Sequence, residues 1–409
     1  MNHVGHAAQL GFPVVDGELT VGGLPVSLLA ARVGRTPFYA YDRRLIDERV
    51  ALLRRVLPAG IELHYAIKAN PMPAVVDFLA PRVDGMDVAS GAELRIALDA
   101  GVSPVEISFA GPGKSDEELQ QAVASGVLLN VESMREIKAL EAASVRLGRP
   151  ARVAVRVNPG FELKSSGMKM GGGPKPFGID AEAVPAALDA IGRYGLSFEG
   201  FHIFCGSQNL HHEAICDTQT QAMELAVRLA VNAPAPVKRL NLGGGFGIPY
   251  FPGDKPLDLD PIGEHLKQIV DVSRANLPEA RLVLELGRYL VGEAGVYVAR
   301  VVDRKVSRGE VFLVTDGGLH HHLAASGNFG QVIRKNYPVA IGTRASETQQ
   351  EVLSVVGPLC TPLDVIADRM ALPAAEPGDL VVVFQSGAYG LTASPVGFLS
   401  HPAPLEVLV

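Results

Sequence analysis

Cysteine is scarce in this sequence, and the three residues present, Cys205, Cys216 and Cys360, have no spacing typical of a metal site. A sparse and odd set of cysteines is typical of reduced thiols rather than of a disulfide framework. The amino-terminal stretch also lacks a basic segment followed by an apolar run, so we expect no signal peptide. Together these features predict a cytoplasmic protein.

An excess of positive charge is missing as well. The chain has 37 lysines and arginines against 44 acidic residues, a net charge of -7, which does not suit a protein that binds the phosphate backbone of nucleic acids. The longest uncharged stretch, residues 380–405, is interrupted by prolines and polar residues, which favours short strands and turns over a membrane span. We therefore expect neither a nucleic-acid partner nor membrane insertion.

Short β-branched runs alternate with helical patterns between about residues 42 and 290, which indicates βαβ units. Serines followed three residues later by glutamate, at Ser90, Ser115 and Ser133, predict helix starts with reciprocal caps. The pattern predicts eight strands, over residues 62–69, 85–90, 106–111, 128–132, 151–158, 196–205, 239–245 and 281–287. Eight such strands predict an α/β chain with a (β/α)₈ TIM barrel, and a doubly wound open sheet is the alternative.

The pattern changes after residue 290, where strand-like runs alternate with turn residues, as they also do over residues 14–40. This predicts a second, antiparallel β domain of residues 1–41 plus 289–409, with the barrel of residues 42–288 inserted into it. One Gly- and Lys-rich insertion, residues 158–180, follows the fifth barrel strand. We expect its residues 161–179, with Lys164, Lys169 and Lys175, to rim the barrel entrance and to dock a carrier-bound or otherwise anionic substrate, with Gly171–Gly173 allowing the loop to close. A flexible surface loop without this role is the alternative.

Catalytic groups of barrels lie where strands end, and four candidates follow predicted strands. Lys68 ends an apolar run, where desolvation favours a neutral, nucleophilic amine, although a lysine that points into solvent is the alternative. Gly243–Gly245 is suited to binding an anion through backbone N–H groups, or forms a tight turn without a ligand. His202 lies near the end of the sixth predicted strand, and a structural histidine is its alternative. Glu285 needs a cationic partner, either Arg288 or a protonated ligand nitrogen.

The four candidates together match the groups of pyridoxal 5′-phosphate better than any one of them alone. This cofactor offers an aldehyde to an amine, a phosphate to a glycine loop, a flat ring to a histidine and a ring nitrogen to a carboxylate. The combination therefore predicts an enzyme that uses pyridoxal phosphate.

The whole chain resembles the fold-type III pyridoxal-phosphate decarboxylases, the group of the diaminopimelate, ornithine and arginine decarboxylases. The segments that resemble the family stand in its order, namely YAIKAN, DVASGAEL, GFHIFCGSQ, LNLGGGFG, ELGRYLV, GPLCTPLD and SGAYG. The resemblance implies an alanine racemase-like barrel with a C-terminal β-sandwich or barrel, and a homodimer with shared active sites.

The resemblance also implies roles for individual residues. Lys68 forms the Schiff base with the cofactor, His202 stacks on its ring, and Glu285 pairs with its ring nitrogen. Cys360 donates a proton after decarboxylation and arrives from the other subunit. The phosphate is bound by Ser207, Gly243, Gly244, Gly245, Gly287, Arg288 and Tyr389, and the substrate by Arg288, Arg334, Tyr337 and Tyr389.

Several departures from diaminopimelate decarboxylases bear on the substrate. Thr361 follows Cys360 where an acidic residue is usual, Phe398-Leu399 replaces an aromatic-Asn pair, and Arg334 and Tyr337 only approximate an Arg…Tyr carboxylate clamp. The chain is more similar to a subgroup with the butirosin-pathway decarboxylase, which acts on glutamate tethered to an acyl carrier protein, and the exosortase A system-associated decarboxylases. We expect an amino-acid α-decarboxylase acting on a free or carrier-tethered amino acid.

Three alternatives to this function stay open. They are diaminopimelate decarboxylation in lysine biosynthesis, a racemase that uses the same cofactor, and a binding protein without activity. A metal site is not expected at His320–His322 or His211-His212, because adjacent side chains point in different directions and no acidic residue lies four positions on. We expect these histidines to be solvated or hydrogen-bonded, and Cys205 and Cys216 to be buried thiols.

Overall fold

The computed structural model describes residues 5–165, 167–331 and 333–409. Residues 1–4 of the amino-terminal stretch discussed above, and the side chain of Lys169, lie outside the described part. The chain forms two compact units. The barrel unit contains Val50–Ile248 and Leu257–Gly287, and the sheet unit contains the residues up to Arg49, Pro249–Pro256 and Arg288–Val409. The boundaries expected from the sequence were 41/42 and 288/289.

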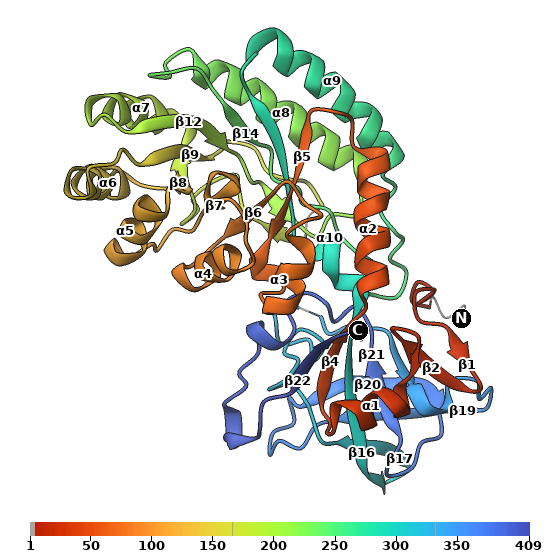
Figure 1. The fold of residues 1–409 in the computed structure, drawn as a ribbon. Helices are drawn as coiled ribbons and strands as arrows, with labels where there is room; N and C mark the ends of the chain where they lie inside the picture. The colour runs from red at the N-terminus through yellow and green to blue at the C-terminus, as the bar shows by residue number, and fades with distance from the viewer. Residues whose placement is uncertain (1–4, 166, 332) are drawn as a thin grey trace. The chain divides into compact units, whose positions relative to one another are not determined.

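The barrel unit contains a closed ring of eight parallel strands (Figure 1). In spatial order they are β9 (Arg152–Asn158), β12 (Ser197–His202), β14 (Arg239–Asn241), β15 (Arg281–Leu286), β5 (Ile61–Ala66), β6 (Gly85–Val88), β7 (Ile107–Phe109) and β8 (Leu128–Val131). The last strand pairs again with the first, β8 with β9, and this pairing closes the ring. The predicted TIM barrel and all eight predicted strands are therefore confirmed.

Helices lie outside this ring (Figure 1). They are α3 (Pro73–Leu79), α4 (Gly91–Asp99), α5 (Asp116–Ser125), α6 (Met134–Leu147), α7 (Val184–Arg193), α8 (His212–Ala230) and α9 (Asp260–Asn276). The hydroxyls of Ser90, Ser115 and Ser133 cap α4, α5 and α6 as predicted, but only Ser115 has the reciprocal bond from its glutamate. The glutamates of the other two helices, Glu93 and Glu136, accept instead from the backbone N–H one residue before the cap.

The sheet unit is built on eight further strands. Six are hydrogen-bonded in the order β18 (Val339–Ile341), β21 (Leu380–Val383), β16 (Gly295–Ser307), β17 (Glu310–Thr315), β19 (Gln350–Val356) and β20 (Val365–Pro373). β4 (Phe38–Tyr41) pairs with β16 and with β22 (Leu405–Leu408). The predicted β domain is confirmed as mostly antiparallel, with parallel pairing of β17 with β19 and of β22 with β4.

One stretch of the sheet unit differs from the strand character expected over residues 14–40. A small meander, β1 (Val14–Val15), β2 (Glu18–Val21) and β3 (Leu24–Pro25), leads into the helix α1 (Val26–Val33). The buried residues of α1 are Val26, Leu29 and Ala30, which follow helical spacing, and Gly34 ends the helix with φ 93°. Residues 26–33 therefore bury one helical face in the core of the sheet unit.

The closed ring of parallel strands determines where the functional side chains can lie. The carboxyl ends of all eight barrel strands are at the same end of the ring, because the strands are parallel. Lys68 follows β5, His202 ends β12, Gly243 follows β14 and Glu285 is the penultimate residue of β15. The barrel therefore brings these four positions to one face.

Candidate active site

Lys68 lies in a short 3-10 turn, Ile67–Ala69, directly after β5 rather than within the strand as predicted. Its Nζ is 3.2 Å from Oε1 of Glu285 and 5.3 Å from the centre of the Phe204 ring. The side chain is 42% exposed, and a carboxylate at this distance favours the charged ammonium form. β15 thus places an acid next to the lysine, and the desolvated, neutral amine stays a prediction.

Glu285 is the centre of the site in the barrel unit. Its side chain is buried, and its second oxygen, Oε2, is 3.2 Å from Nε2 of His202. Burial alone would raise the pKa of this carboxyl group, but the charge of Lys68 and the hydrogen bond with His202 hold the pKa well below its usual range. Glu285 is therefore a carboxylate at neutral pH, and its partners in the barrel unit are Lys68 and His202.

His202 is 2% exposed and lies with its ring edge toward Phe204, 6.3 Å between ring centres. Its Nδ1 has no hydrogen-bond partner within the described residues. A buried ring nitrogen without a partner is uncommon, and it leaves the histidine able to interact with a ligand.

The glycine loop after β14 lies against the same strand as Glu285. The backbone N–H of Glu285 donates to the carbonyl oxygen of Gly243 at 2.8 Å, and a Cβ atom on Gly244 would stand 2.2 Å from the carbonyl oxygen of Glu285. Gly243 and Gly245 have φ values of 71° and 78°, which favour glycine. No side chain therefore fits at these positions. The N–H of Gly243 donates to Oδ1 of Asn241 at 2.8 Å, so an anion would be bound by the next N–H groups of the loop.

The insertion after β9 packs on this loop and on the strand that contains Ser207. Its strand β10 (Met168–Lys169) pairs with β13 (Gly206–Ser207). Leu163 of the insertion packs on Gly245, where an added Cβ atom would lie 3.0 Å from Cδ2 of Leu163. The N–H of Gly171 donates to the carbonyl oxygen of Cys205, at 3.1 Å. These contacts tie the insertion to the barrel instead of leaving its glycine run as a free hinge.

Three further residues are predicted to bind the cofactor. Gly287 is the last residue of the barrel unit, and Arg288 and Tyr389 belong to the sheet unit. Arg288 begins α10 (Arg288–Val291), and its Nη1 donates to the hydroxyl of Tyr250 at 2.7 Å. Its guanidinium carbon is 4.6 Å from the centre of the Tyr389 ring. Tyr389 has a φ of 53°, a strained conformation for a tyrosine that is typical of functional positions. Arg288 and Tyr389 therefore lie together, as expected of two ligands of one group.

The two halves of the approximate carboxylate clamp have different surroundings. A side-chain nitrogen of Arg334, Nη2, donates to the carbonyl oxygen of Val365. Tyr337 is buried, and its ring centre is 4.7 Å from that of Tyr250. Arg334 lines a cavity of the sheet unit, whose lining does not include Tyr337. A shared role for Arg334 and Tyr337 stays a prediction.

Cys360 is exposed in the turn that follows β19. The turn is held by the buried carboxylate of Asp364, which accepts hydrogen bonds from the backbone N–H groups of Leu359 at 2.8 Å and Leu319 at 2.6 Å. Cys205 is buried as predicted, and burial raises the pKa of its thiol to about 12, whereas Cys216 is only partly buried. Cys360 is therefore the cysteine accessible to a reaction partner.

The histidines of the run His320–His322 in the sheet unit are all buried. Of the two alternatives expected for this run, solvation is therefore wrong. Nε2 of His322 is 2.9 Å from the hydroxyl of Ser386, and Nε2 of His321 is 3.1 Å from the carbonyl oxygen of Pro402. His320 packs against His321 with 3.6 Å between ring centres. Two of the three rings are thus hydrogen-bonded.

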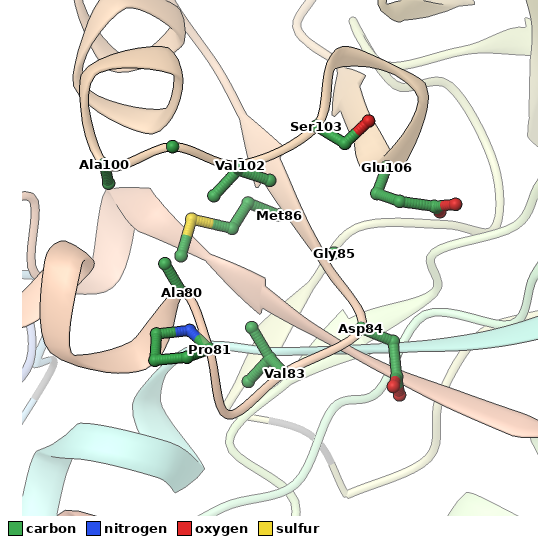
Figure 2. A pocket seen from close by; sticks show the side chains of 11 residues that line it. Ala80, Pro81, Val83, Asp84, Gly85, Met86, Ala100, Val102, Ser103 and Glu106 are labelled. Carbon is green, nitrogen blue, oxygen red and sulfur yellow. The ribbon is translucent and has the colours of Figure 1, made fainter.

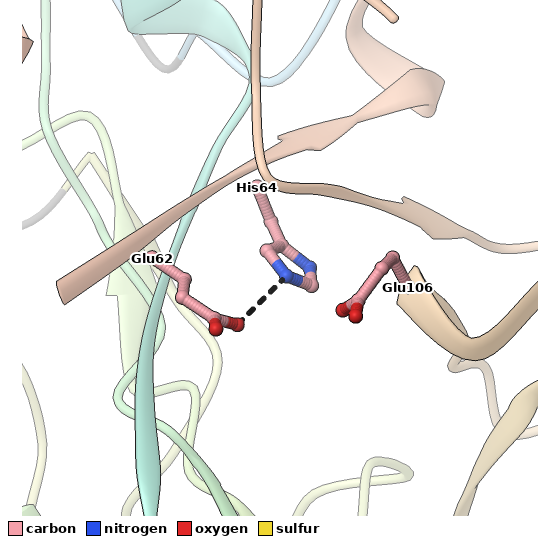
Figure 3. A group of neighbouring side chains, drawn as sticks. All are labelled: Glu62, His64 and Glu106. Carbon is pink, nitrogen blue, oxygen red and sulfur yellow. Dashed lines mark ion pairs between the residues drawn. The ribbon is translucent and has the colours of Figure 1, made fainter. Parts of the chain in front are cut away.

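Sequence reasoning missed a charged cluster at the amino-terminal end of the barrel (Figure 3). Ligating atoms of Glu62, His64 and Glu106 lie within 4.8 Å of one another. The carboxylates already bind Arg281 and Arg239, and Asp87 is 3.3 Å from Nδ1 of His64. Although burial opposes it, Asp87 raises the pKa of His64 to about 9, so the imidazole is protonated. Because its carboxylates are already paired with arginines, the cluster is an ion-pair network.

A cavity of about 340 Å³ lies beside this network, between the ends of β6 and β7 (Figure 2). Its walls are mainly apolar, and its two acidic residues, Asp84 and Glu106, are already paired with Arg54 and Arg239 respectively. The catalytic groups follow the opposite ends of the strands. This cavity therefore has no part in the site around Lys68.

The residues of the site fit pyridoxal phosphate. Lys68 offers an amine, the buried carboxylate of Glu285 suits a protonated ring nitrogen, and His202 has a ring nitrogen without a partner. The glycine loop has no room for a Cβ at Gly244, which suits a phosphate held by backbone N–H groups. Each group of the cofactor thus has a counterpart of the required chemistry.

Comparison with known proteins agrees with this chemistry. Residues 43–292 match the family described as pyridoxal-dependent decarboxylase, pyridoxal binding domain. The L-glutamyl-[BtrI acyl-carrier protein] decarboxylase of Niallia circulans is 39% identical over 91% of this chain and 88% of that protein. The diaminopimelate decarboxylase of Aquifex aeolicus is 32% identical over 96% and 91%.

Solved structures of decarboxylases are similar to this chain as well. The diaminopimelate decarboxylase of M. jannaschii, in complex with L-lysine, superimposes with a TM-score of 0.86 over 97% of this chain and 92% of that chain, at 26% identity. Among the described residues, no helix is long and apolar enough to cross a bilayer. The chain belongs to the fold-type III pyridoxal-phosphate decarboxylases, the family of the ornithine, arginine and diaminopimelate decarboxylases, and is a pyridoxal-phosphate-dependent amino-acid decarboxylase.

Proposed function

We propose that this enzyme removes the α-carboxylate of an amino acid attached to an acyl carrier protein. The observation on which the chemistry rests is the meeting of Lys68, Glu285 and His202 at the ends of three barrel strands. The attached substrate is supported by the Niallia circulans relative, whose name gives a carrier-bound glutamyl group as its substrate.

In the proposed mechanism, one group of residues binds and orients the cofactor. Pyridoxal phosphate, when bound, supplies a ring that accepts the electron pair released as CO₂ departs. Lys68 would provide the amine for covalent attachment of the cofactor, and His202 would flank its ring. The glycine loop Gly243–Gly245, helped by Ser207, Gly287, Arg288 and Tyr389, would hold the phosphate.

Two further residues stabilise charge and transfer a proton in the proposed mechanism, Glu285 and Cys360. Glu285, a carboxylate even though it is buried, keeps a proton on the ring nitrogen and so preserves the positive charge that favours loss of CO₂. Cys360 then delivers its thiol proton to the α-carbon that has lost the carboxylate. The carbon–carbon bond breaks, CO₂ leaves, and a carbon–hydrogen bond forms in its place.

The departure at Thr361 gives the test of the substrate. We expect kcat/KM for free diaminopimelate to be at least about 100-fold below that for a glutamyl carrier protein, because Thr361 offers no charge to the distal ammonium and an unpaired buried charge costs several kcal/mol. Release of CO₂ from each substrate measures this. Thr361→Glu is the matched control and should improve diaminopimelate turnover.

A wild-type kcat/KM for diaminopimelate above about 10⁴ M⁻¹s⁻¹, and above that for the carrier-bound substrate, would show that the enzyme belongs to lysine biosynthesis instead.

We propose further that two copies form a homodimer in which Cys360 of one subunit serves the barrel of the other. The surroundings of Cys360 support this, because large apolar side chains are exposed there: Leu363 is 59% exposed, and Asn328, next to the exposed Phe329, donates to the carbonyl oxygen of Leu363. An exposed apolar surface of this kind is typical of an interface. A reactive thiol at Cys360 also suits the reducing cytoplasm, which we propose as the location.

Mixing two inactive variants tests the shared site. Lys68→Ala and Cys360→Ala, unfolded and refolded together, should recover about one quarter of wild-type activity, because half of the dimers are hybrids and each hybrid has one intact site. As a control, the Lys68→Ala/Cys360→Ala double variant mixed with wild type should form inactive hybrids. Hybrids that gain nothing over either parent would contradict the shared arrangement.

A further inference from the structure

A second cavity, of about 470 Å³, lies wholly within the sheet unit. Its lining includes Arg334, Lys335 and Arg369, together with His6 and one acidic residue, Asp368. Three positively charged residues thus line the cavity together with one acidic residue, on a chain whose net charge is -7. The cavity is therefore a local site of attraction for an anion.

The pairing of strand β20 is irregular at Arg369. Strand β20 pairs with β19 through Leu353↔Met370 and Val355↔Ala367, so that Asp368 and Arg369 together oppose the single residue between them, Ser354. This is a β-bulge, which redirects the side chain of the bulged strand. Arg369 has a φ of 46°, in the left-handed region where glycine is favoured. An arginine at a strained position of this kind points to a use for its side chain.

The walls of the cavity hold one another in place. The side-chain amide of Asn336 makes two hydrogen bonds to the backbone of Asp368, donating to its carbonyl oxygen at 2.8 Å and accepting from its N–H at 2.9 Å. The carbonyl oxygen of Asn336 is in turn 2.8 Å from Nε2 of His6. Since Asn336 directly follows Arg334 and Lys335, these bonds hold the backbone of this segment next to the bulge.

The cations retain donors that a ligand can use. Arg334 donates to the carbonyl oxygen of Val365, but its Nε is buried and has no partner within the described residues. The side chain of Arg369 is 72% exposed, and its contact with Asp368 is long, 3.8 Å. Two guanidinium groups and an ammonium suit a doubly charged phosphate better than a single carboxylate.

We propose that this cavity binds a phosphate ester, and that the phosphate is that of the phosphopantetheine arm on which the carrier presents the substrate. The second half of the proposal rests on the proposed function, because the carrier supplies the arm. The first half, a phosphate-ester site at the bulge, rests on the cavity alone. The site is distinct from the glycine loop, which belongs to the barrel unit.

Calorimetric titration of the holoenzyme tests the phosphate site without any carrier protein, since the cofactor then fills the glycine loop. The probes are phosphopantetheine, pantetheine and AMP. Wild type should bind phosphopantetheine at least about tenfold more tightly than pantetheine, as expected for charge-assisted hydrogen bonds to a phosphate. Equal affinity for the two probes would overturn the phosphate site, and preference for AMP over phosphopantetheine would overturn its assignment to the carrier.

Arg369→Gly separates binding from stability. Glycine relieves the left-handed backbone, so this variant should melt at or above the wild-type temperature while its affinity for phosphopantetheine falls about tenfold. Lys335→Met should bind about as weakly, whereas Lys305→Met, which removes an exposed lysine of β16 outside the cavity, should bind like wild type. Unchanged binding in Arg369→Gly would contradict the proposal.

Kinetics then distinguish failure of the two proposals. With a glutamyl carrier protein, Arg369→Gly should raise KM about tenfold and leave kcat and the absorbance of the cofactor unchanged. If wild type binds phosphopantetheine but does not turn over a carrier-bound substrate, the proposed function fails while the phosphate site stands. An unchanged KM in Arg369→Gly would overturn the role of the cavity in carrier recognition.

Discussion

Lys68→Ala is expected to abolish decarboxylation, with a loss of more than about 10³-fold in kcat, because the amine both attaches the cofactor and takes part in proton transfer. The purified wild-type protein should be yellow, and the variant should lose the absorbance of the covalently attached cofactor. Reduction with borohydride followed by peptide mapping identifies the modified lysine. Modification of a lysine other than Lys68 in the wild-type protein would contradict the assignment.

Lys68→Arg provides the matched control for this loss. An arginine preserves a positive charge opposite Glu285, which is 3.2 Å from the lysine nitrogen, but it cannot form a Schiff base. If the loss of activity came from breaking the ion pair, Lys68→Arg would retain activity. We expect it to be as inactive as Lys68→Ala, with a melting temperature closer to that of wild type.

The barrel could be predicted from the sequence because of the order of its strands and helices. β6, β8 and β14 are buried at every position, although they contain polar residues such as Asp87, Asn130 and Asn241. They could be found because short strand-like runs alternate regularly with helical patterns. The stretch over residues 26–33 was harder, because its buried positions are too few to distinguish helical from strand spacing before the structure is known. Short apolar runs of this kind are ambiguous by period alone.

The site could be predicted as a set of positions but not as a set of contacts. Lys68, His202 and Glu285 each lie at or next to the carboxyl end of a strand, and this is visible in the sequence. That Glu285 pairs with Lys68 depends on β15 lying next to β5, which only closure of the ring brings about. For the same reason the His64 cluster is not visible in the sequence, because Glu62 and His64 of β5 meet Glu106, which directly precedes β7, only in the folded barrel.

The bulge at Arg369 shows a second limit of sequence reasoning. A left-handed position is normally marked by glycine or asparagine, and an arginine there has no such mark. The strain becomes visible only when the pairing of β19 with β20 is known. Functional positions that break a local rule are therefore the ones that pattern analysis misses.

Glu285→Gln is expected to lower kcat about 10²- to 10³-fold, the usual effect of removing one preorganised electrostatic contact from a reacting centre. Glutamine has nearly the same shape and can still accept a hydrogen bond from His202, whose Nε2 lies 3.2 Å from the carboxylate. It has no negative charge, so it cannot keep a proton on the ring nitrogen of the cofactor. The cofactor should stay bound, because Lys68 and the glycine loop are unchanged.

The comparison of Glu285→Gln with Glu285→Asp separates charge from packing. Aspartate keeps the charge but is one methylene shorter, so we expect a smaller loss in kcat than for glutamine. CO₂ release measures kcat, and the absorbance spectrum reports the fraction of enzyme with cofactor attached. If Glu285→Gln retained most of its kcat while Glu285→Asp lost more, packing around the carboxylate rather than its charge would control the reaction. The low pKa of buried Glu285, which Lys68 and His202 maintain, would then have no part in catalysis.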